Sequence, residues 1–224
     1  MDSQNNLPPI LKVEGIHKHF GEVKVLEDAN LEVMPGEIVL LTGENGAGKT
    51  TLIKIIAGIT QANAGKVIFD NMDITNKRPD TITKLGISSL LQGGIIFPKL
   101  FVNEHFQLAV QGVGKVYSQK DMEKVYRLFP DMNKITKKRA GLLSGGERQM
   151  LAIALLILQD AKLWLLDEPI SGLSSSAIKI VSESIISYCI ESKITVILIE
   201  QRTNEFKKIA NKVYTVSGGK VFEQ

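Results

Sequence analysis

The stretch Gly43-Glu-Asn-Gly-Ala-Gly-Lys-Thr-Thr51 decides the fold, because it matches the phosphate-binding template G-x-x-x-x-G-K-[ST] at every fixed position. The apolar run Glu37–Leu41 before it indicates a buried strand, and Leu52–Ala57 after it indicates a short helix. Such a strand, turn and helix place backbone N–H groups and a helix N-terminus around an anion. A turn that matched the template by chance would lack these flanking elements. We expect Lys49 to reach the β- and γ-phosphates of a nucleotide and the Thr50 hydroxyl to ligate Mg²⁺.

The composition is that of an ordinary soluble globular protein, with 224 residues, 44% hydrophobic and 23% charged. The net charge of +3 does not argue for a nucleic-acid partner, and the basic run Lys134–Arg139 is interpreted as a solvated face. Cys189 is the only cysteine, so no internal disulfide can form, which suits a reducing compartment. Met1–Asn6 has no signal-peptide character, and the apolar run Met150–Leu158 is about half the length of a membrane span. Any membrane association is therefore expected to go through a partner.

Strand and helix patterns alternate along the chain. The predicted strands are an edge strand at Leu11–Gly15, strands around Glu27-Asp28 within Val23–Val33, and strands at Lys66–Phe69, Ile87–Leu91, Lys162–Leu166 and Ile194–Ile199, followed by a hairpin at Val213–Val216 and Lys220–Phe222. The predicted helices are Pro79–Leu85, Val102–Val110, Ser118–Leu128, a helix opening at the glycines after Leu143 and running to Leu158, Ser175–Glu191 and Asn204–Ala210, with Asp70–Lys77 as a loop.

Four polar signals fall where predicted parallel strands end. Gly43, Gln92, Asp167 and Gln201 each lie at or just after the carboxyl end of such a strand. Ligands of parallel α/β sheets gather at this edge. The sequence therefore predicts that these four positions converge on one active site.

Two acidic residues follow the apolar strand that ends at Leu166. Asp167 is expected to hold the Mg²⁺ that Thr50 also serves, and Glu168 to orient or deprotonate the attacking water. The alternative is an Asp-Glu-Pro turn that merely ends a strand. The presence of the glycine-lysine loop in the same chain favours phosphoryl-transfer chemistry.

A second glycine turn, Leu143-Ser-Gly-Gly-Glu147, opens a predicted helix. A serine and two glycines at a helix start make another anion site through exposed N–H groups and the helix dipole. The two turns either converge within one monomer, or the second serves a nucleotide held by another copy.

These motifs resemble those of the nucleotide-binding subunits of ATP-binding cassette (ABC) transporters over nearly the whole chain. Gly43–Thr51 resembles the Walker A loop, Leu143–Glu147 the family signature, and Leu163–Glu168 the Walker B strand with its catalytic glutamate. Gln92 matches the Q-loop glutamine, and Phe20 matches the aromatic residue that stacks on adenine, with a core role for Phe20 as the alternative. The resemblance implies an α/β fold with a P-loop NTPase core and a mostly parallel sheet. It also implies an N-terminal antiparallel sub-domain and an inserted helical sub-domain at about residues 93–157 of a single domain, 1–224.

The resemblance also assigns site residues. It implies a head-to-tail dimer in which each ATP lies between one chain's Walker A loop and the partner's signature turn. The nucleotide-binding residues are then Phe20, Gly43, Glu44, Asn45, Gly46, Ala47, Gly48, Lys49, Thr50, Thr51, Gln92, Ser144, Gly145 and Gly146, the last three acting in trans. The Mg²⁺ ligands are Thr50, Gln92 and Asp167, and the catalytic residues are Lys49, Glu168 and Gln201.

Arg139–Ile153, Ile197–Gln201 and Ile96–Pro98 look most like ATPases of branched-chain amino-acid and urea importers. Three positions depart from the wider family. Gln201 stands for the switch histidine and can donate a hydrogen bond but cannot take a proton. Ser174 stands for the D-loop aspartate, and Ala154-Leu-Leu156 lacks the arginine usual in this helix. These departures concern coupling between sites rather than nucleotide binding.

The resemblance predicts an ATPase that powers a membrane transporter, located in the cytoplasm on the inner face of the cell membrane. A second cassette and integral-membrane permease subunits, docked near Gln92–Glu104, are the expected partners, and no nucleic acid is expected. An alternative is a soluble ABC ATPase acting on nucleic acid or ribosomes, which usually carries two cassettes or a coiled-coil insertion that this sequence lacks. Another is a cassette that binds ATP without hydrolysis, which the intact Lys49, Asp167 and Glu168 argue against.

Overall fold

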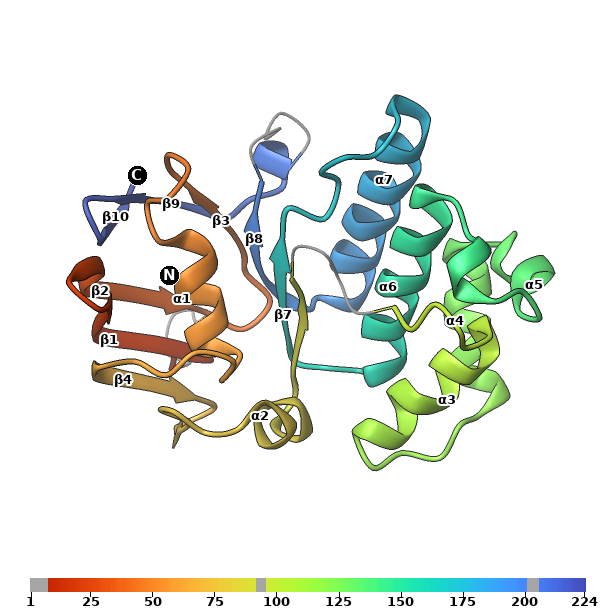
Figure 1. Ribbon diagram of the computed structural model, residues 1–224, viewed down its shortest axis with the longest axis horizontal. Coiled ribbons are helices and arrows are strands. Elements are labelled where there is room, and N and C mark those ends of the chain that lie inside the picture. The colour runs from red at the N-terminus through yellow and green to blue at the C-terminus, as the bar shows by residue number, and fades with distance from the viewer. Residues whose placement is uncertain (1–7, 92–95, 201–205) are drawn as a thin grey trace, which may run out of the picture.

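A computed structural model describes residues 8–91, 96–200 and 206–224. An antiparallel four-stranded sheet lies at one end, drawn in red to yellow in Figure 1, with strand order β2-β1-β4-β5. Its strands are β1 (Leu11–Phe20), β2 (Val23–Val33), β4 (Ala64–Phe69) and β5 (Met72–Asp73). The predicted N-terminal antiparallel unit is thus confirmed.

Three local predictions in this sheet were wrong. Leu11–Gly15 is not an edge strand, because β1 pairs with β2 on one side and with β4 on the other. The predicted break at Glu27-Asp28 is a change of register within one long strand, where Asp28 has a φ of 61°. The short strand β5 lies inside the stretch expected to be a loop, paired with β4.

The central sheet has six strands in the order β10-β9-β3-β8-β7-β6. All pairings are parallel except the terminal hairpin of β9 and β10, which confirms the mostly parallel core. The strands are β3 (Ile38–Thr42), β6 (Ile87–Leu90), β7 (Leu163–Asp167), β8 (Thr195–Ile199), β9 (Lys212–Ser217) and β10 (Lys220–Glu223).

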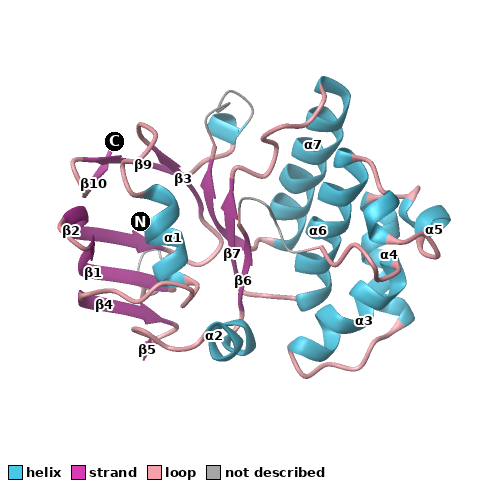
Figure 2. Cartoon of the chain, in the orientation of Figure 1, coloured by secondary structure: helices cyan, strands magenta, loops and turns pink. Residues whose placement is uncertain are grey.

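Seven α-helices accompany the sheets in the described residues (Figure 2). They are α1 (Lys49–Ile56), α2 (Pro79–Leu85), α3 (Val102–Gly112), α4 (Gln119–Leu128), α5 (Met132–Ile135), α6 (Gly145–Gln159) and α7 (Ser175–Ser192). The Ser118 cap of α4 is as predicted, since its hydroxyl accepts from the Asp121 N–H at 3.3 Å. The four-residue α5 was not predicted, and the described part of Asn204–Ala210 holds only a 3₁₀ turn at Phe206–Lys208.

Two hydrophobic cores lie on opposite faces of the central sheet. Alternate residues of β3 serve different cores: Leu40 packs toward α3–α7, whereas Val39 and Leu41 pack toward α1 and the antiparallel sheet. The strand termini are therefore fixed by packing on both faces. This fixed frame holds the loops beyond the carboxyl ends of β3, β7 and β8.

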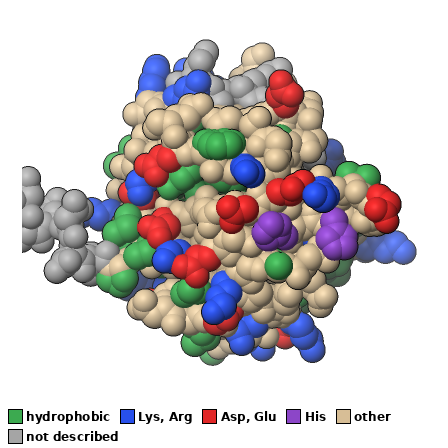
Figure 3. Space-filling view, turned by 90° about the vertical axis from the view of Figure 1, so that its left-hand side faces the viewer, with side chains coloured by type: hydrophobic (Ala, Val, Ile, Leu, Met, Phe, Trp, Pro, Cys, Tyr) green, Lys and Arg blue, Asp and Glu red, His purple; other side chains and the backbone are tan. Residues whose placement is uncertain are grey.

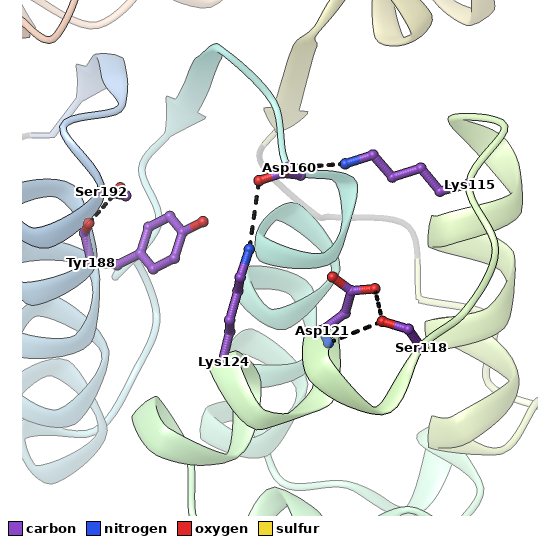
Figure 4. A network of polar contacts seen from close by, with 7 residues as sticks. All are labelled: Lys115, Ser118, Asp121, Lys124, Asp160, Tyr188 and Ser192. Atoms are coloured by element: carbon purple, nitrogen blue, oxygen red, sulfur yellow. Dashed lines mark hydrogen bonds and ion pairs between the residues drawn. The ribbon is translucent and has the colours of Figure 1, made fainter.

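Charged contacts tie the helices on one side of the sheet together (Figure 4). Asp160 follows α6 and accepts from Lys115 at 2.8 Å, with Lys124 of α4 at 3.8 Å. The hydrogen bond from Lys115 lowers the pKa of Asp160. Each such exposed pair contributes only about 0–1 kcal/mol, so these contacts orient α4 more than they stabilise the fold. Among the helices of the described residues, none is long and apolar enough to cross a membrane.

Candidate functional site

The turn between β3 and α1 requires glycine at specific positions. Gly43, Gly46 and Gly48 have φ values of 134°, 81° and 108°. A methyl group at Gly43 would lie 2.3 Å from the Val216 carbonyl oxygen, and one at Gly48 would lie 2.8 Å from the Leu26 side chain. The turn therefore keeps its backbone close to β9 and β2. No side chain caps α1, so its first N–H groups can bind an anion.

Lys49 lies within this turn and is only 6% exposed. Its ammonium donates to the carbonyl oxygens of Gly43 and Glu44, both at 2.8 Å. A cavity of about 370 Å³ opens beside the ammonium. It is lined by Asn45, Gly46, Gly48, Lys49, Thr50, Thr51 and Glu168, so the end of β7 lies beside the glycine turn as the sequence predicted.

Thr50, which lines this cavity, contacts Asp167 at the end of β7. The Thr50 hydroxyl donates to Asp167 Oδ1 at 3.2 Å. Asp167 is only 2% exposed, and its Oδ2 has no hydrogen-bond partner among the described residues. Burial raises the pKa of this carboxyl group. A hydroxyl and a buried carboxylate oxygen left without a partner are the hard oxygen ligands that Mg²⁺ prefers, so these residues fit that ion.

Glu168 has an unusual backbone conformation for a side chain of its size. Its φ is 51°, in the left-handed region, and its N–H donates to the Ile199 carbonyl at 2.9 Å. Left-handed backbone at a non-glycine residue costs about 1–3 kcal/mol and concentrates at functional sites. The conformation turns the chain at the end of β7 and leaves Glu168 lining the cavity of about 370 Å³ at the glycine turn, which we call the P-loop cavity. The sequence predicted a catalytic role for Glu168 but not this backbone conformation.

The second glycine turn begins α6 through a capping box. The Ser144 hydroxyl accepts from the Glu147 N–H at 3.2 Å, and the Glu147 carboxylate accepts from the Ser144 N–H at 2.7 Å. The backbone hydrogen bond from Ser144 lowers the pKa of Glu147. Ser144, Gly145 and Gly146 line a separate cavity of about 380 Å³ together with the start of α7.

The glycines of this second turn have different structural needs. Neither Gly145 nor Gly146 adopts a positive φ. A methyl group at Gly146 would lie 3.0 Å from the Ala177 side chain, whereas at Gly145 the nearest neighbour is the Leu173 side chain at 4.0 Å. The fold of one chain therefore has room for a side chain at Gly145.

The remaining residues singled out from the sequence lie on different elements or outside the described residues. Phe20 ends β1 with 53% of its surface exposed, which excludes the alternative core role. The Lys18 ammonium lies 4.6 Å from the centre of its ring. Ser174 caps α7, accepting from the Ala177 N–H at 3.4 Å. Gln92 and Gln201 lie outside the described residues.

One residue near the glycine turn was missed by sequence reasoning. Glu200 follows β8, is only 5% exposed, and lines a cavity of about 480 Å³ with Gly43, Glu44, Asn45 and Lys49. Its signal was available, because a polar residue directly after a buried strand is the same signal that selected Asp167. The adjacent Gln201 was selected from the sequence at this strand end instead.

The sequence was compared with known protein families. The family described as ABC transporter matches residues 26–171, well over half of the chain. The chain belongs to the ABC transporter family. As an ABC cassette it binds ATP and has ATPase activity, which agrees with the predicted α/β fold and enzyme class.

Two curated relatives are ATP-binding proteins of branched-chain amino acid transport. This ABC cassette is 35% identical to the high-affinity branched-chain amino acid transport ATP-binding protein BraG of Pseudomonas aeruginosa, over 95% of this chain and 91% of BraG. It is 32% identical to the probable branched-chain amino acid transport ATP-binding protein LivF of Archaeoglobus fulgidus, over 95% and 90%.

Solved structures agree with the fold. A nucleotide-free ATP-binding cassette from an ABC transporter superposes with a TM-score of 0.81 at 26% identity, covering 96% of this chain and 90% of that one. The ADP conformation of the cassette MJ1267 also gives a TM-score of 0.81, at 27% identity and with the same coverage. The resemblance stated from the motifs alone is thereby confirmed.

Proposed function

We propose that this ABC cassette hydrolyses ATP to drive branched-chain amino-acid uptake through permease subunits, on the inner face of the cell membrane. The observation that carries the hydrolytic part is the cavity lined by the glycine turn, Thr50 and Glu168, together with the contact that Thr50 makes with Asp167. The transport ATP-binding relatives, BraG and LivF, support the amino-acid substrate.

A nucleic-acid or ribosomal partner is not favoured. On the face of the antiparallel sheet shown in Figure 3, acidic and basic side chains are interspersed rather than gathered into a basic patch. The net charge of +3 is also low for a chain that binds a polyphosphate backbone.

Each residue of the P-loop cavity has a role in this proposal. The N–H groups of the turn and the Lys49 ammonium bind the β- and γ-phosphates, and Glu168 orients and deprotonates the attacking water. Thr50, Asp167 and Gln92 would hold Mg²⁺, which when bound neutralises charge on the phosphates. Gln201 would donate a hydrogen bond to the γ-phosphate.

The second glycine turn serves a nucleotide held by another chain. Gly145 has room for a side chain within its own fold, so the space that glycine leaves open is available to a second molecule. The first N–H groups of α6 at Ser144–Gly146 then face the γ-phosphate of the partner's ATP. In this arrangement two cassettes, identical or related, close around two nucleotides.

Adenine stacks on the exposed ring of Phe20. Residues 1–224 act as a single cassette domain, with about 93–157 as its helical sub-domain, although residue 157 lies inside α6. This sub-domain carries the signature turn, so its position relative to the P-loop decides whether two cassettes can close.

The substitution Glu168→Gln tests this assignment. It replaces the carboxylate that acts as the base by an amide of the same size and leaves the cavity in place. ATP binding is therefore retained, turnover is lost and the chain is trapped as an ATP-bound dimer. Nucleotide titration, phosphate release and molecular mass by light scattering report these three properties. Glu183→Gln, on an exposed face of α7, is the matched control and leaves all three unchanged. Normal turnover in the Glu168→Gln protein would reject Glu168 as the base.

A further inference from the structure

A loop before α3 is joined by backbone hydrogen bonds to the segment that leads into the signature turn. The Ala140 N–H donates to the Leu100 carbonyl and the Gly141 N–H to the Pro98 carbonyl, both at 2.9 Å. Returning bonds run from the Val102 and Asn103 N–H groups to Lys138 and Thr136. We call residues 97–101 the Phe97 loop. Its position is thus coupled to residues 136–143, which immediately precede Ser144.

His105 fastens the Phe97 loop to the first turn of α3. The imidazole is 98% buried, since only 2% of the residue is exposed. Its Nε2 lies 3.0 Å from the Phe97 backbone nitrogen, and its Nδ1 lies 2.8 Å from the Phe101 carbonyl oxygen. The Phe97 and His105 rings pack with centroids 5.9 Å apart.

The partners of the two ring nitrogens define one protonation state. A carbonyl oxygen only accepts, so Nδ1 must carry a proton for the Phe101 contact. A backbone N–H only donates, so Nε2 must present its lone pair to Phe97. Both contacts are therefore satisfied only by the neutral imidazole protonated at Nδ1. In the imidazolium, Nε2–H would oppose the Phe97 N–H.

We propose that His105 is a positioning residue that fixes the Phe97 loop only while its imidazole is neutral, so that protonation releases the loop. Imidazole is the side chain that ordinarily gains or loses a proton between about pH 5 and 8, so its chemistry suits a latch that opens on protonation.

The charged groups on the elements around His105 form contacts with other partners, so they do not compensate for a positive charge on its imidazole. Glu104, beside His105 on α3, accepts from the Phe101 N–H at 2.6 Å. Glu147 of α6 pairs with Lys138 of the facing segment, and Asp80 of α2 pairs with Arg78. Arg139 of the facing segment and Arg148 of α6 donate to the Lys99 and Leu143 carbonyls. No ion pair joins His105 to a carboxylate in the part of the chain that the structure describes.

The loop held by His105 carries an exposed apolar surface. Phe97 is 51% exposed and Leu142, on the facing segment, is 76% exposed, while the Arg139 guanidinium lies 4.8 Å from the centre of the Phe101 ring. Under the proposed function, this surface belongs to the region that docks the permease. Protonation of His105 would then weaken coupling to the membrane subunits without touching the P-loop.

Hydrogen exchange of the Phe97 amide tests the latch on the full chain. After correction for intrinsic rates, protection of this amide falls by about tenfold per pH unit once the imidazole takes up its proton. The matched variant His105→Gln keeps an oxygen acceptor for Phe97 that does not titrate, so its protection stays level. The Val196 amide, which donates to the Glu37 carbonyl at 2.9 Å and lies outside the Phe97 loop and its facing segment, serves as an internal reference. Equal falls in both proteins, or none in the unmodified chain, would overturn the proposal.

Nitrogen chemical shifts of the His105 ring give a second test that needs no variant. At about pH 8 the proton is expected on Nδ1, and a proton on Nε2 would overturn the proposal. Neither experiment needs ATP or a permease. Their failure is therefore distinguishable from a failure of the proposed function, which the Glu168→Gln experiment tests.

Discussion

Asp167→Asn should stabilise the protein in the absence of ligand and destabilise it relative to the unmodified chain when Mg²⁺ and ATP are present. The carboxylate is buried, Thr50 donates to one of its oxygens, and the other oxygen has no partner in the described residues. An asparagine keeps an oxygen for the Thr50 hydroxyl and removes the buried charge. The variant therefore separates the stability of the empty fold from the chemistry of the site.

The sign of the change in stability follows from the direction of the Asp167 pKa shift. Burial raises it from 3.8, so the folded chain holds this proton more tightly than the unfolded chain. Stability from this group is present at acid pH and is lost as the pH rises through the folded pKa. A buried polar atom without a partner costs about 1–3 kcal/mol, and more when it is charged. An uncharged amide lowers that cost without removing it, so we expect a gain of about 1 kcal/mol at neutral pH.

Denaturant unfolding of both proteins, with and without Mg²⁺ and ATP, shows whether the more stable protein changes from the variant to the unmodified chain when ligand is added. The unmodified chain should gain about 2.7 kcal/mol at ligand concentrations of 100 times Kd, and the variant much less. Asp160→Asn is the control, because Lys115 lowers the pKa of that exposed carboxyl and its loss brings no gain. A ligand-free Asp167→Asn protein that is less stable than the unmodified chain at neutral pH would refute the reasoning.

Three further predictions use simpler measurements. Gly43→Ala should lower the free energy of unfolding by about 2–4 kcal/mol, because the methyl group meets a carbonyl at 2.3 Å. Gly46→Ala meets nothing within 4 Å and should lose only about 1–2 kcal/mol; equal losses in denaturant unfolding would contradict this. Phe20→Ala should weaken ATP binding by about 1–3 kcal/mol, and the equally exposed Phe222→Ala should not, as judged by nucleotide titration. Burial raises the pKa of Cys189 to about 12, so its thiol should resist alkylation at about pH 8 until the chain unfolds, and rapid labelling of the native protein would argue against this burial.

The fold was predictable wherever local signals agreed with tertiary packing. The apolar run at Ile194–Ile199 predicted a buried strand that the structure has at Thr195–Ile199, and the helix predicted to begin at Pro79 has the predicted limits, Pro79–Leu85. The interior position of β1 was not predictable, because its second partner, β4, is distant in sequence. The four-residue α5 is too short to show a helical period.

The sequence indicated which side chains lie together at the glycine turn but not the backbone conformations there. Sequence motifs indicated that Thr50 and Asp167 act together, and the structure brings their side chains into contact. The left-handed backbone of Glu168 could not be foreseen, since it depends on the bond from its N–H to the neighbouring strand β8. The buried Glu200 could have been foreseen from its place after β8. The His105 latch required knowledge of both hydrogen-bond partners.

The central claim is that each ATP site needs the second glycine turn of another chain. Gly145→Glu, introduced into the Glu168→Gln protein, places a carboxylate where that turn would meet the partner's γ-phosphate. Beyond α6 itself, the nearest atom to the added Cβ belongs to the Leu173 side chain at 4.0 Å. Molecular mass with and without ATP is the deciding measurement. We expect the double variant to bind ATP as tightly as the Glu168→Gln protein but to remain a monomer. An ATP-induced dimer of the double variant would contradict it.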